Sequence, residues 1–436
     1  MAAPVNPPRG MRDFLPADKA RREHALGIIR NVYRSHGFDE IETPVVEDYA
    51  RLHAGLGGDN EKLSFSILKR GIPPEALAAA AEAGDAEELA DLGLRFDLTV
   101  PLTRFFASHR AELPPVFRSI QIAPVWRAER PQKGRYRQFV QADIDIIGES
   151  GLLAEIELIT ATSQALAALG LAGCVIRVND RRILFGLLEH CGFASKMHDR
   201  ALITIDKLDK IGVTGVVDEL READAEAAER MGEILTNVAP LVGSGEGGGS
   251  GIALAHDAIA EVLPAGAAEE GVANLVALGE ALEGSLPEGV DVRFDPTLVR
   301  GMGYYTGTIF EIAHPGSGSS VGGGGRYDGM VGRFLGQDVP AVGFSIGFER
   351  VVDLIELPEA TGPEAVALIA DADVELADLL ALKRALVDRG HRVRLEKRQK
   401  NMKALLARVA SEGFTRVANV RAGASAADEL EFRELS

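Results

Sequence analysis

Arginines and carboxylates follow one another in "WRAERPQKGRYRQFVQADIDIIG", which occupies residues 126–148. Five of its first twelve residues are Arg or Lys and only one is acidic, whereas Asp143 and Asp145 then alternate with isoleucines. The guanidinium of Arg127 matches phosphate oxygens bidentately. Gln141 and the two aspartates share one face of a strand and suit a cationic or hydrogen-bond-donating group. The pattern favours a ligand that joins phosphates to a cationic group; the alternative is a solvated basic loop.

Three further stretches could complete such a site. In "LVRGMGYYTGTIFE", Arg300 precedes Tyr304 and Tyr305, whose rings and hydroxyls could line a pocket. The alternative is a turn that divides the two tyrosines between core and surface. The glycines of "VGGGGRYDG" (321–329) could cradle a base or ribose, although no GxGxxG follows a strand and no GxxxxGK[ST] is present. In "AVGFSIGFERVV", Arg350 could face a polyphosphate tail.

A lone carboxylate stands out in "LRFDLTVPLTR", where Asp97 lies between Phe96 and Leu98. We expect an apolar strand here, and a buried carboxylate needs a partner. That partner is either the ammonium group of a ligand or one of two nearby arginines, Arg95 and Arg104.

The groups on both sides of the basic run are positioned by two strands. Residues 116–126 and 139–148 read as strands, and the short segment between them contains Pro131 and Gly134, so the basic run is predicted to lie in a hairpin loop. A helix is expected over 17–36.

The other segments alternate between helix and strand. Residues 37–47 alternate like a strand that Pro44 breaks, and a strand followed by a helix is expected at 92–106. The Ala/Glu-rich stretch 75–93 reads as one or two exposed helices. Residues 151–168 read as a helix, and the chain from about 180 to 285 as helical and acidic, interrupted by the flexible "GSGEGGGSG". Strand-like, glycine-rich sequence then returns.

The last part of the chain follows a linker-like stretch, "LPEATGPEA" (357–365). Strands then alternate with helices expected at 374–389 and 400–412, which predicts a small α/β domain. From residue 382 to 408 ten Lys or Arg residues accompany two acids, and strand alternation puts Arg392 and Arg394 on one face. A solvated basic face is the alternative to a phosphate-binding one.

Composition bounds the class of protein. The 436 residues carry a formal charge of −18, are 46% apolar, and favour a soluble globular chain of two or three domains. The sequence contains no run of 18 uncharged apolar residues, so we expect no membrane span. The two cysteines, Cys174 and Cys191, cannot form a four-ligand zinc site of their own, and they fit a reducing cytoplasm. The acidic charge argues against indiscriminate nucleic-acid binding.

Taken together, these stretches resemble the histidyl-tRNA synthetase family of class II aminoacyl-tRNA synthetases along almost the whole chain. "GFDEIETPVVE", "FRSIQIAPVWRAERPQKGRYRQF" and "AVGFSIGFER" resemble the three class II motifs. "LVRGMGYYTGTIFE" and "GGGGRYDG" resemble the two histidine-specific motifs. "RFDLTVPLTR" and "QADIDIIG" are similar to the branch that includes archaeal and eukaryotic enzymes.

The resemblance implies a role for each candidate residue. Arg300 and Arg127 are implied to be catalytic at the α-phosphate. The residues implied to bind histidine are Asp97, Thr99, Arg127, Gln141, Asp145, Arg300, Tyr304 and Tyr305. Those implied to bind ATP are Arg127, Glu129, Arg135 and Arg350, and those implied to contact tRNA are Lys133, Arg392, Arg394 and Arg398. ATP is implied as a substrate with Mg²⁺, without dedicated metal ligands from the protein and without a prosthetic group.

The resemblance also implies an α/β architecture with an α+β catalytic core. Residues 1–178 and 288–357 would form a mostly antiparallel sheet flanked by helices. Residues 179–287 would be a helical insertion, and residues 363–436 a small anticodon-binding-like α/β domain. The implied partners are histidine, ATP, the histidine tRNA and a second copy of the chain, in the cytoplasm.

Three features depart from the family pattern: Gly303 stands where Asp is usual, the Ala-rich insert 75–91 is long, and the C-terminal domain is short. A second function therefore stays open, that of a non-catalytic paralogue serving as the regulatory subunit of ATP phosphoribosyltransferase in histidine biosynthesis. That class usually lacks the C-terminal domain and parts of the synthetase motifs. This chain retains both, which favours the ligase.

Overall fold

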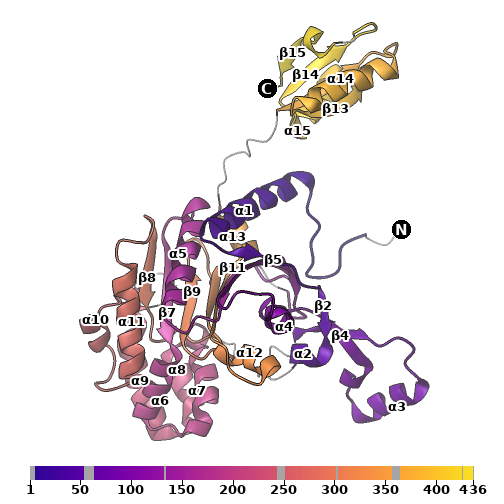
Figure 1. Ribbon diagram of the computed structural model, residues 1–436. Helices are drawn as coiled ribbons and strands as arrows, with labels where there is room; N and C mark the ends of the chain where they lie inside the picture. The colour runs from indigo at the N-terminus through magenta and orange to yellow at the C-terminus, as the bar shows by residue number, and fades with distance from the viewer. Residues whose placement is uncertain are drawn as a thin grey trace. The chain divides into compact units, whose positions relative to one another are not determined.

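The chain divides into two compact units: Met1–Asp13 with Arg22–Leu357, and Phe14–Arg21 with Pro358–Ser436 (Figure 1). The computed structural model describes residues 5–53, 63–131, 134–242, 251–300, 303–355, 364–424 and 426–435.

An eight-stranded sheet forms the centre of the larger unit, with the strand order β1-β5-β6-β11-β10-β9-β7-β8. In chain order the strands are β1 (Asp39–Glu40), β5 (Phe117–Trp126), β6 (Gln138–Ile147), β7 (Cys174–Asp180), β8 (Val290–Phe294), β9 (Thr308–Ala313), β10 (Gly322–Arg326) and β11 (Ala341–Gly347). Only the pairs β1–β5 and β7–β8 are parallel among the described strands of this sheet. The predicted mixed, mostly antiparallel sheet is confirmed.

Strand β6 shows why this sequence forms the middle of the sheet. Its alternation directs Ile144 and Ile146 to one face, where both are fully buried in the core, and Asp143 and Asp145 to the other. The apolar face needs a cover, and helices α5 (Leu153–Ala168) and α13 (Phe348–Leu354) pack against β6 and β11. The hairpin of β5 and β6 appears where it was predicted.

Helix α1 (Pro16–Ser35) packs onto the same core through Ala25, Ile29 and Tyr33, which recur at helical spacing and are fully buried. The other helices near the sheet are α4 (Thr99–His109) and α12 (Asp328–Leu335), which pack against each other.

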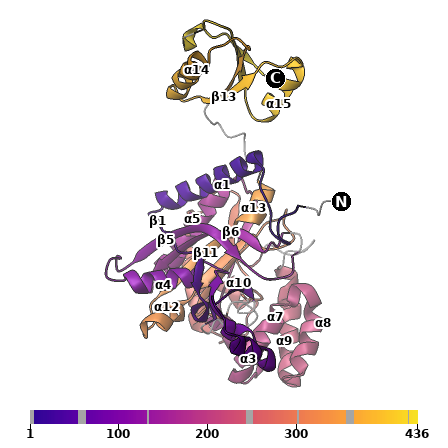
Figure 2. The same ribbon diagram turned by 90° about the vertical axis from the view of Figure 1, so that its right-hand side faces the viewer.

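The acidic segment between β7 and β8 is helical, as predicted. Its helices are α6 (Arg181–Cys191), α7 (His198–Ile205), α8 (Leu208–Arg221), α9 (Ala225–Val238), α10 (His256–Ala260) and α11 (Glu269–Leu282). Figure 2 shows α7, α8 and α9 side by side, and α11 packs back onto β7 and α5. Most of the glycine-rich interruption, residues 243–250, lies outside the described residues.

A smaller sheet corrects two expectations. Strands β2 (Val46–Asp48), β4 (Ala90–Leu94) and β3 (Phe65–Leu68) pair in the order β2-β4-β3 beside α2 (Tyr49–His53). The Ala/Glu-rich stretch forms only one α-helix, α3 (Pro74–Ala83), and its end becomes β4 because that segment pairs on both sides. The expected strand around Asp97 is wrong, since β4 ends at Leu94 and Asp97 lies in the bend before α4.

The smaller unit is an α/β domain, as predicted. Strands β13 (Arg392–Lys397), β12 (Ala365–Ala370), β14 (Arg416–Val420) and β15 (Phe432–Glu434) form one sheet in that order, with only β14–β15 antiparallel among its described strands. Helices α14 (Leu376–Asp388) and α15 (Met402–Ser411) supply Leu382 and Val409 to two separate apolar clusters.

Candidate active site

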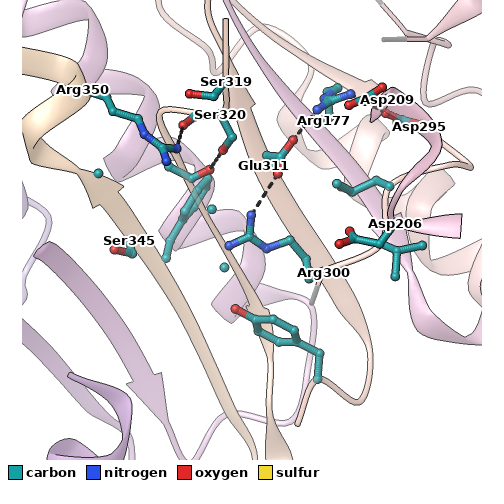
Figure 3. A pocket seen from close by; sticks show the side chains of 18 of the residues that line it. Arg177, Asp206, Asp209, Asp295, Arg300, Glu311, Ser319, Ser320, Ser345 and Arg350 are labelled. Atoms are coloured by element: carbon teal, nitrogen blue, oxygen red, sulfur yellow. Dashed lines mark hydrogen bonds and ion pairs between the residues drawn. The ribbon is translucent and has the colours of Figure 1, made fainter. Parts of the chain in front are cut away.

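A cavity of about 1080 Å³ opens in the larger unit and draws its walls from segments far apart in the sequence. It is lined by every residue for which the resemblance implied contact with histidine or ATP, namely Asp97, Thr99, Arg127, Glu129, Arg135, Gln141, Asp145, Arg300, Tyr304, Tyr305 and Arg350. Figure 3 shows part of this wall, with Arg300 directed at Glu311 and Arg350 at Ser320.

Strand register explains how the wall is assembled. One row of paired residues crosses the sheet through Asp143, Ser345, Gly323, Glu311 and Arg177. Residues that pair directly on adjacent strands point to the same face of a sheet. Polar groups from four strands, together with a glycine from β10, therefore meet on the face that borders the cavity.

Glycines in β10 and β11 make room for the side chains of the site. A Cβ atom on Gly343 would lie 2.0 Å from Asp145 Oδ1, and one on Gly325 would lie 2.9 Å from Tyr305 Cδ1. Neither side chain could keep its place beside a larger residue. The glycine run predicted as a cradle for a base forms strand β10, in which Gly323 leaves room for Arg300 and Gly325 leaves room for Tyr305.

The carboxyl groups of Asp97, Asp143 and Asp145 are among the buried acids that line the cavity. Burial raises the pKa of each, that of Asp145 to about 7 and that of Asp143 well above its ordinary value, with the neighbouring charge of Asp145 as the second cause for Asp143. Tyr327 donates a hydrogen bond of 2.6 Å to Asp145 Oδ1. A cationic ligand would stabilise the ionised form of these carboxyl groups.

Asp97 has one oxygen without a partner. Its Oδ1 accepts from the backbone N–H of Val100 at 3.2 Å, at the start of α4, but its Oδ2 is buried and has no hydrogen-bond partner among the described residues. Arg95 instead donates to the carbonyl of Thr43 at 2.8 Å, and Arg104 to Glu47 at 2.6 Å. The alternative in which either arginine pairs with Asp97 is therefore wrong.

Two more polar atoms of the cavity wall are buried without a hydrogen-bond partner among the described residues. Within the described part of the chain, neither Gln141 Oε1 nor Asp143 Oδ1 has a hydrogen-bond partner. The amide nitrogen of Gln141 donates to Asp143 Oδ2 at 3.3 Å and to Ser345 Oγ at 3.2 Å, which directs its oxygen elsewhere. Buried polar atoms are normally hydrogen-bonded, so three acceptors in one cavity indicate a ligand that carries donors.

Arginines supply the opposite charge. Arg127 Nε donates to the carbonyl of Phe96 at 3.0 Å, and its guanidinium lies 5.0 Å from the ring centroid of Phe139. Burial lowers the pKa of Arg350, and the positive charges of Arg135 and Arg127 lower it further. Because these positive charges disfavour one another, they favour an anionic ligand.

Arg127 links the two groups of charges. Its charge opposes the rise that burial causes in the pKa of Asp97 and Asp143, and it also acts on Arg350. The arrangement of the cavity agrees with the prediction of a ligand in which an anionic part is joined to a cationic part. Lys133, for which the resemblance implied a contact with tRNA, lies outside the described residues.

The two tyrosines both belong to the cavity. Tyr304 and Tyr305 are 7% and 8% exposed, and their ring centroids lie 4.8 Å apart. The alternative that divided them between core and surface is wrong. Tyr304 also meets the ring of Tyr327 edge-on at 6.1 Å, so it packs against the tyrosine whose hydroxyl donates to Asp145.

Several residues of the wall were not singled out from the sequence. Tyr327 lies in the quoted "GGGGRYDG", and Glu311 ends the quoted "LVRGMGYYTGTIFE". Arg177 and Asp295 belong to the same charged cluster. Period-two alternation in β9 could have placed Glu311 on the polar face, but no local pattern pairs it with Arg177, which is 134 residues away.

The basic residues of the smaller unit are arranged differently. Arg392 and Arg394 share one face of β13, since both guanidinium groups lie 4.5 Å from the ring centroid of Phe414. However, Arg394 forms an ion pair with Glu412, and Arg398 with Asp371. Glu412 and Asp371 both lie outside residues 382–408, the segment in which basic residues outnumber acids. Much of the local positive charge is therefore compensated.

The described part of the chain contains no group of three or more His, Cys, Asp or Glu side chains that could hold a metal ion. No helix among the described residues is long and apolar enough to cross a membrane. Both cysteines are buried, and burial raises the pKa of both thiols to about 11, so neither is a reactive thiolate.

Comparison with known proteins adds independent information. Residues 10–351 match the sequence profile described as histidyl-tRNA synthetase. A histidine–tRNA ligase from Leifsonia xyli is 66% identical over 422 residues, which cover 97% of this chain and 96% of the relative.

Solved structures share the fold. The histidyl-tRNA synthetase of Nostoc sp. PCC 7120 aligns with a TM-score of 0.77 at 25% identity and covers 100% of this chain and 95% of that one. A Bacillus halodurans protein described as an ATP phosphoribosyltransferase regulatory subunit/histidyl-tRNA synthetase aligns with a TM-score of 0.74 at 22% identity, covering 97% and 99%. The latter likeness concerns the fold alone.

Proposed function

The chain belongs to the histidyl-tRNA synthetase family and is a histidine–tRNA ligase, and from that premise we propose how the residues of the cavity share the reaction. The activity joins histidine to ATP as histidyl-adenylate with release of pyrophosphate. It then transfers the histidyl group to the terminal adenosine of the tRNA. The observation that carries the proposal is that one cavity contains both the unpaired buried acceptors and the mutually repelling arginines.

Histidine is held by the acceptors. Asp97 and Gln141, with the hydroxyl of Thr99, bind the α-ammonium group, which supplies three N–H donors. Support comes from the unpaired Asp97 Oδ2 and Gln141 Oε1. An ammonium ion would offset the burial that raises the pKa of Asp97.

The imidazole is read by Asp145 with Tyr304 and Tyr305. Asp145 accepts a ring N–H while the Tyr327 hydroxyl, which donates to Oδ1, fixes the orientation of the carboxyl group. Selectivity follows because an amino acid without a ring donor would leave a buried carboxylate unpaired, and such rejection is strong. The close packing of Asp145 against Gly343 limits the room for adjustment.

ATP is held by the arginines. Arg127 binds the α-phosphate, Glu129 and Arg135 contact the nucleotide, and Arg350 meets the β- and γ-phosphates. Support comes from the lowered pKa of Arg350, which burial and the charges of Arg135 and Arg127 produce. A polyphosphate would relieve that repulsion.

The first step is an in-line displacement. A carboxylate oxygen of histidine attacks the α-phosphorus, a new O–P bond forms, and the bond to the pyrophosphate oxygen breaks. Arg300 and Arg127 hold positive charge where negative charge develops on the α-phosphate, and preorganised charge of this kind lowers the barrier. In the second step a ribose hydroxyl of the tRNA attacks the carbonyl carbon and AMP leaves.

Magnesium would come with the nucleotide. Because the described residues contain no group of three metal-ligating side chains, a Mg²⁺ ion would take most of its ligands from phosphates and water, which is its usual preference. Glu129, the cavity carboxylate that we propose contacts the nucleotide, would be the side chain nearest such an ion. Bound there, the ion would offset phosphate charge.

The remaining partners follow from the family. We propose an isologous homodimer, which sedimentation would contradict by finding only a species near 46.4 kDa at micromolar concentration. We further propose that Arg392, Arg394, Arg398 and Lys133 contact tRNA phosphates and that the enzyme works in the cytoplasm.

The assignment as a ligase is tested by histidine-dependent exchange of labelled pyrophosphate into ATP, followed by charging of the histidine tRNA. Exchange that requires histidine and no other amino acid is the expected result. The regulatory alternative is named in the description of a structural relative that is 22% identical, and that likeness shows the fold alone. Histidine binding without exchange or charging would support that alternative and contradict the ligase.

A further inference from the structure

A row of ion-paired side chains, two of them buried and two half-buried, begins at Arg300 and continues through Glu311 and Arg177 to Asp295. Arg300 Nη1 donates to Glu311 Oε2 at 3.0 Å, and the other oxygen of Glu311 accepts from Arg177 Nη2. Arg177 Nη1 in turn donates to Asp295 Oδ2 at 3.0 Å. Asp295 Oδ1 accepts from the backbone N–H and the hydroxyl of Thr297 at 2.9 and 2.6 Å, which anchors the far end.

The strands of the sheet hold this row of ion-paired side chains in place. Arg177 in β7 and Glu311 in β9 are direct cross-strand partners, and Gly323 in β10 is the next residue of the same row. A Cβ atom on Gly323 would lie 2.7 Å from Arg300 Nη1, so the Arg300 guanidinium lies directly against the β10 backbone. Figure 3 shows the sequence Arg300, Glu311, Arg177 and Asp295 along the wall.

We propose that Glu311 is a positioning residue for Arg300, and that Arg177 and Asp295 fix Glu311 in turn. The inference rests on the proposed catalytic role of Arg300. Within the described part of the chain, Arg300 Nε is buried without a hydrogen-bond partner. Glu311 thus fixes one nitrogen of the guanidinium without using its Nε–H.

Charge balance explains why four side chains, Arg300, Glu311, Arg177 and Asp295, are linked in a row. A carboxylate beside the α-phosphate would repel the phosphate and the substrate carboxylate. Arg177 compensates Glu311, and Asp295, which is fully buried, compensates Arg177. Buried charges are tolerated when paired. Arg300 therefore keeps a fixed orientation while its positive charge remains available to the substrate.

A double-mutant cycle in the histidine-dependent pyrophosphate exchange assay separates positioning from a general structural role. Glu311→Gln keeps the shape and removes the charge. We expect it to lower kcat by about tenfold to a hundredfold, which a small misplacement of a catalytic group causes. KM for ATP should stay unchanged or fall, because a negative charge near the phosphates has been removed.

The effect of Glu311→Gln in a variant that already lacks Arg300 distinguishes positioning from a general structural role. In an Arg300→Ala background, Glu311→Gln should cost less than about twofold, because effects that pass through one group do not add. Glu311→Asp, which restores the charge, should recover part of kcat. Equal fold losses from Glu311→Gln in both backgrounds would overturn the proposal.

Glu157→Gln is the matched control. It breaks a two-bond ion pair with Arg118, at 2.6 and 2.7 Å, in the same unit and away from the cavity lining. It should change kcat little in either background; losses that match those of Glu311→Gln would contradict positioning.

The same assay distinguishes a failure of the ligase assignment from a failure of the proposal for Glu311. A wild-type chain without histidine-dependent exchange would refute the ligase itself. A wild-type chain with exchange but an unimpaired Arg300→Ala variant would refute the role of Arg300, and with it the proposal for Glu311.

Discussion

Arginines gather in two regions of this molecule, and the two gatherings differ in what surrounds them. In the cavity, Arg127 and Arg350 are brought together with other arginines, and buried carboxyl and amide oxygens nearby have no partner in the described chain. In the smaller unit, Arg394 and Arg398 are exposed at 35% and 41% of their side-chain surface and are paired with acids.

The comparison teaches that a concentration of charge in the sequence does not identify a site. Exposed ion pairs typically contribute about 0–1 kcal/mol and rearrange easily. A buried polar atom left unpaired costs about 1–3 kcal/mol. An arrangement that sustains three unpaired buried acceptors in one cavity is therefore the stronger indication of a ligand.

The largest expected effect concerns the cavity. Arg300→Ala should lower the rate of adenylate formation by about 10²–10³, the usual loss when one preorganised stabiliser is removed. Substrate binding should change less than turnover. Single-turnover formation of histidyl-adenylate measures the rate, and near-wild-type kinetics would show that the cavity arginines do not serve the chemical step through Arg300.

The next effect depends on pH. Because burial raises the pKa of Asp145 to about 7, its carboxyl group is protonated below that pH and loses the negative charge that accepts an imidazole N–H. Histidine affinity should therefore fall as pH falls through 7, by up to about tenfold per pH unit. Calorimetric titration of histidine between pH 6 and about 8.5 measures this change.

Asp145→Asn supplies the control, because free histidine titrates in the same range. The variant should weaken histidine binding more than ATP binding, and its affinity should lack the additional pH dependence. Identical pH profiles in the two proteins, or equal losses for both substrates, would remove Asp145 as the partner of the ring.

The smallest effect is expected in the smaller unit and uses two residues of one strand. Arg392 and Arg394 contact the same aromatic ring, but only Arg394 has a carboxylate partner in the described chain. Arg392→Gln should weaken tRNA binding and reduce its salt slope by about one unit, as expected for one lost phosphate contact. Arg394→Gln should change the slope less.

Filter binding of the histidine tRNA at several salt concentrations compares the two variants directly. A larger change from Arg394→Gln than from Arg392→Gln would mean that the ion pair with Glu412 does not limit phosphate binding. Unchanged slopes in both variants would remove this face of β13 from the tRNA contact.

Local sequence pattern was sufficient where one segment determines the outcome. Alternation in residues 139–148 predicted β6 and the shared face of Gln141 and Asp145. It was misleading for Asp97, because the apolar neighbours of that residue suit a bend before α4 as well as a strand. The strand pairing that extends β4 over residues 90 and 91, which were expected to be helical, is a tertiary effect.

Ion pairs between residues far apart in the sequence could not be predicted from local patterns. The ion pairs Arg177–Glu311 and Arg394–Glu412 depend on which strands and helices become neighbours, and no spacing within one segment encodes that choice. The resemblance to a known family supplied the candidate residues of the cavity. The register of the sheet then added the residues that hold them.

Histidine titration of Asp97→Asn tests most directly whether the unpaired acceptors of the cavity exist for a ligand. The asparagine keeps an oxygen for the N–H of Val100 and avoids burying a charge, so the fold should be as stable as the wild type or more so. Histidine affinity should fall about tenfold to a hundredfold, because the α-ammonium group loses its carboxylate. A variant that unfolds at lower temperature and binds histidine as tightly as the wild type would make Asp97 a structural residue and contradict the account.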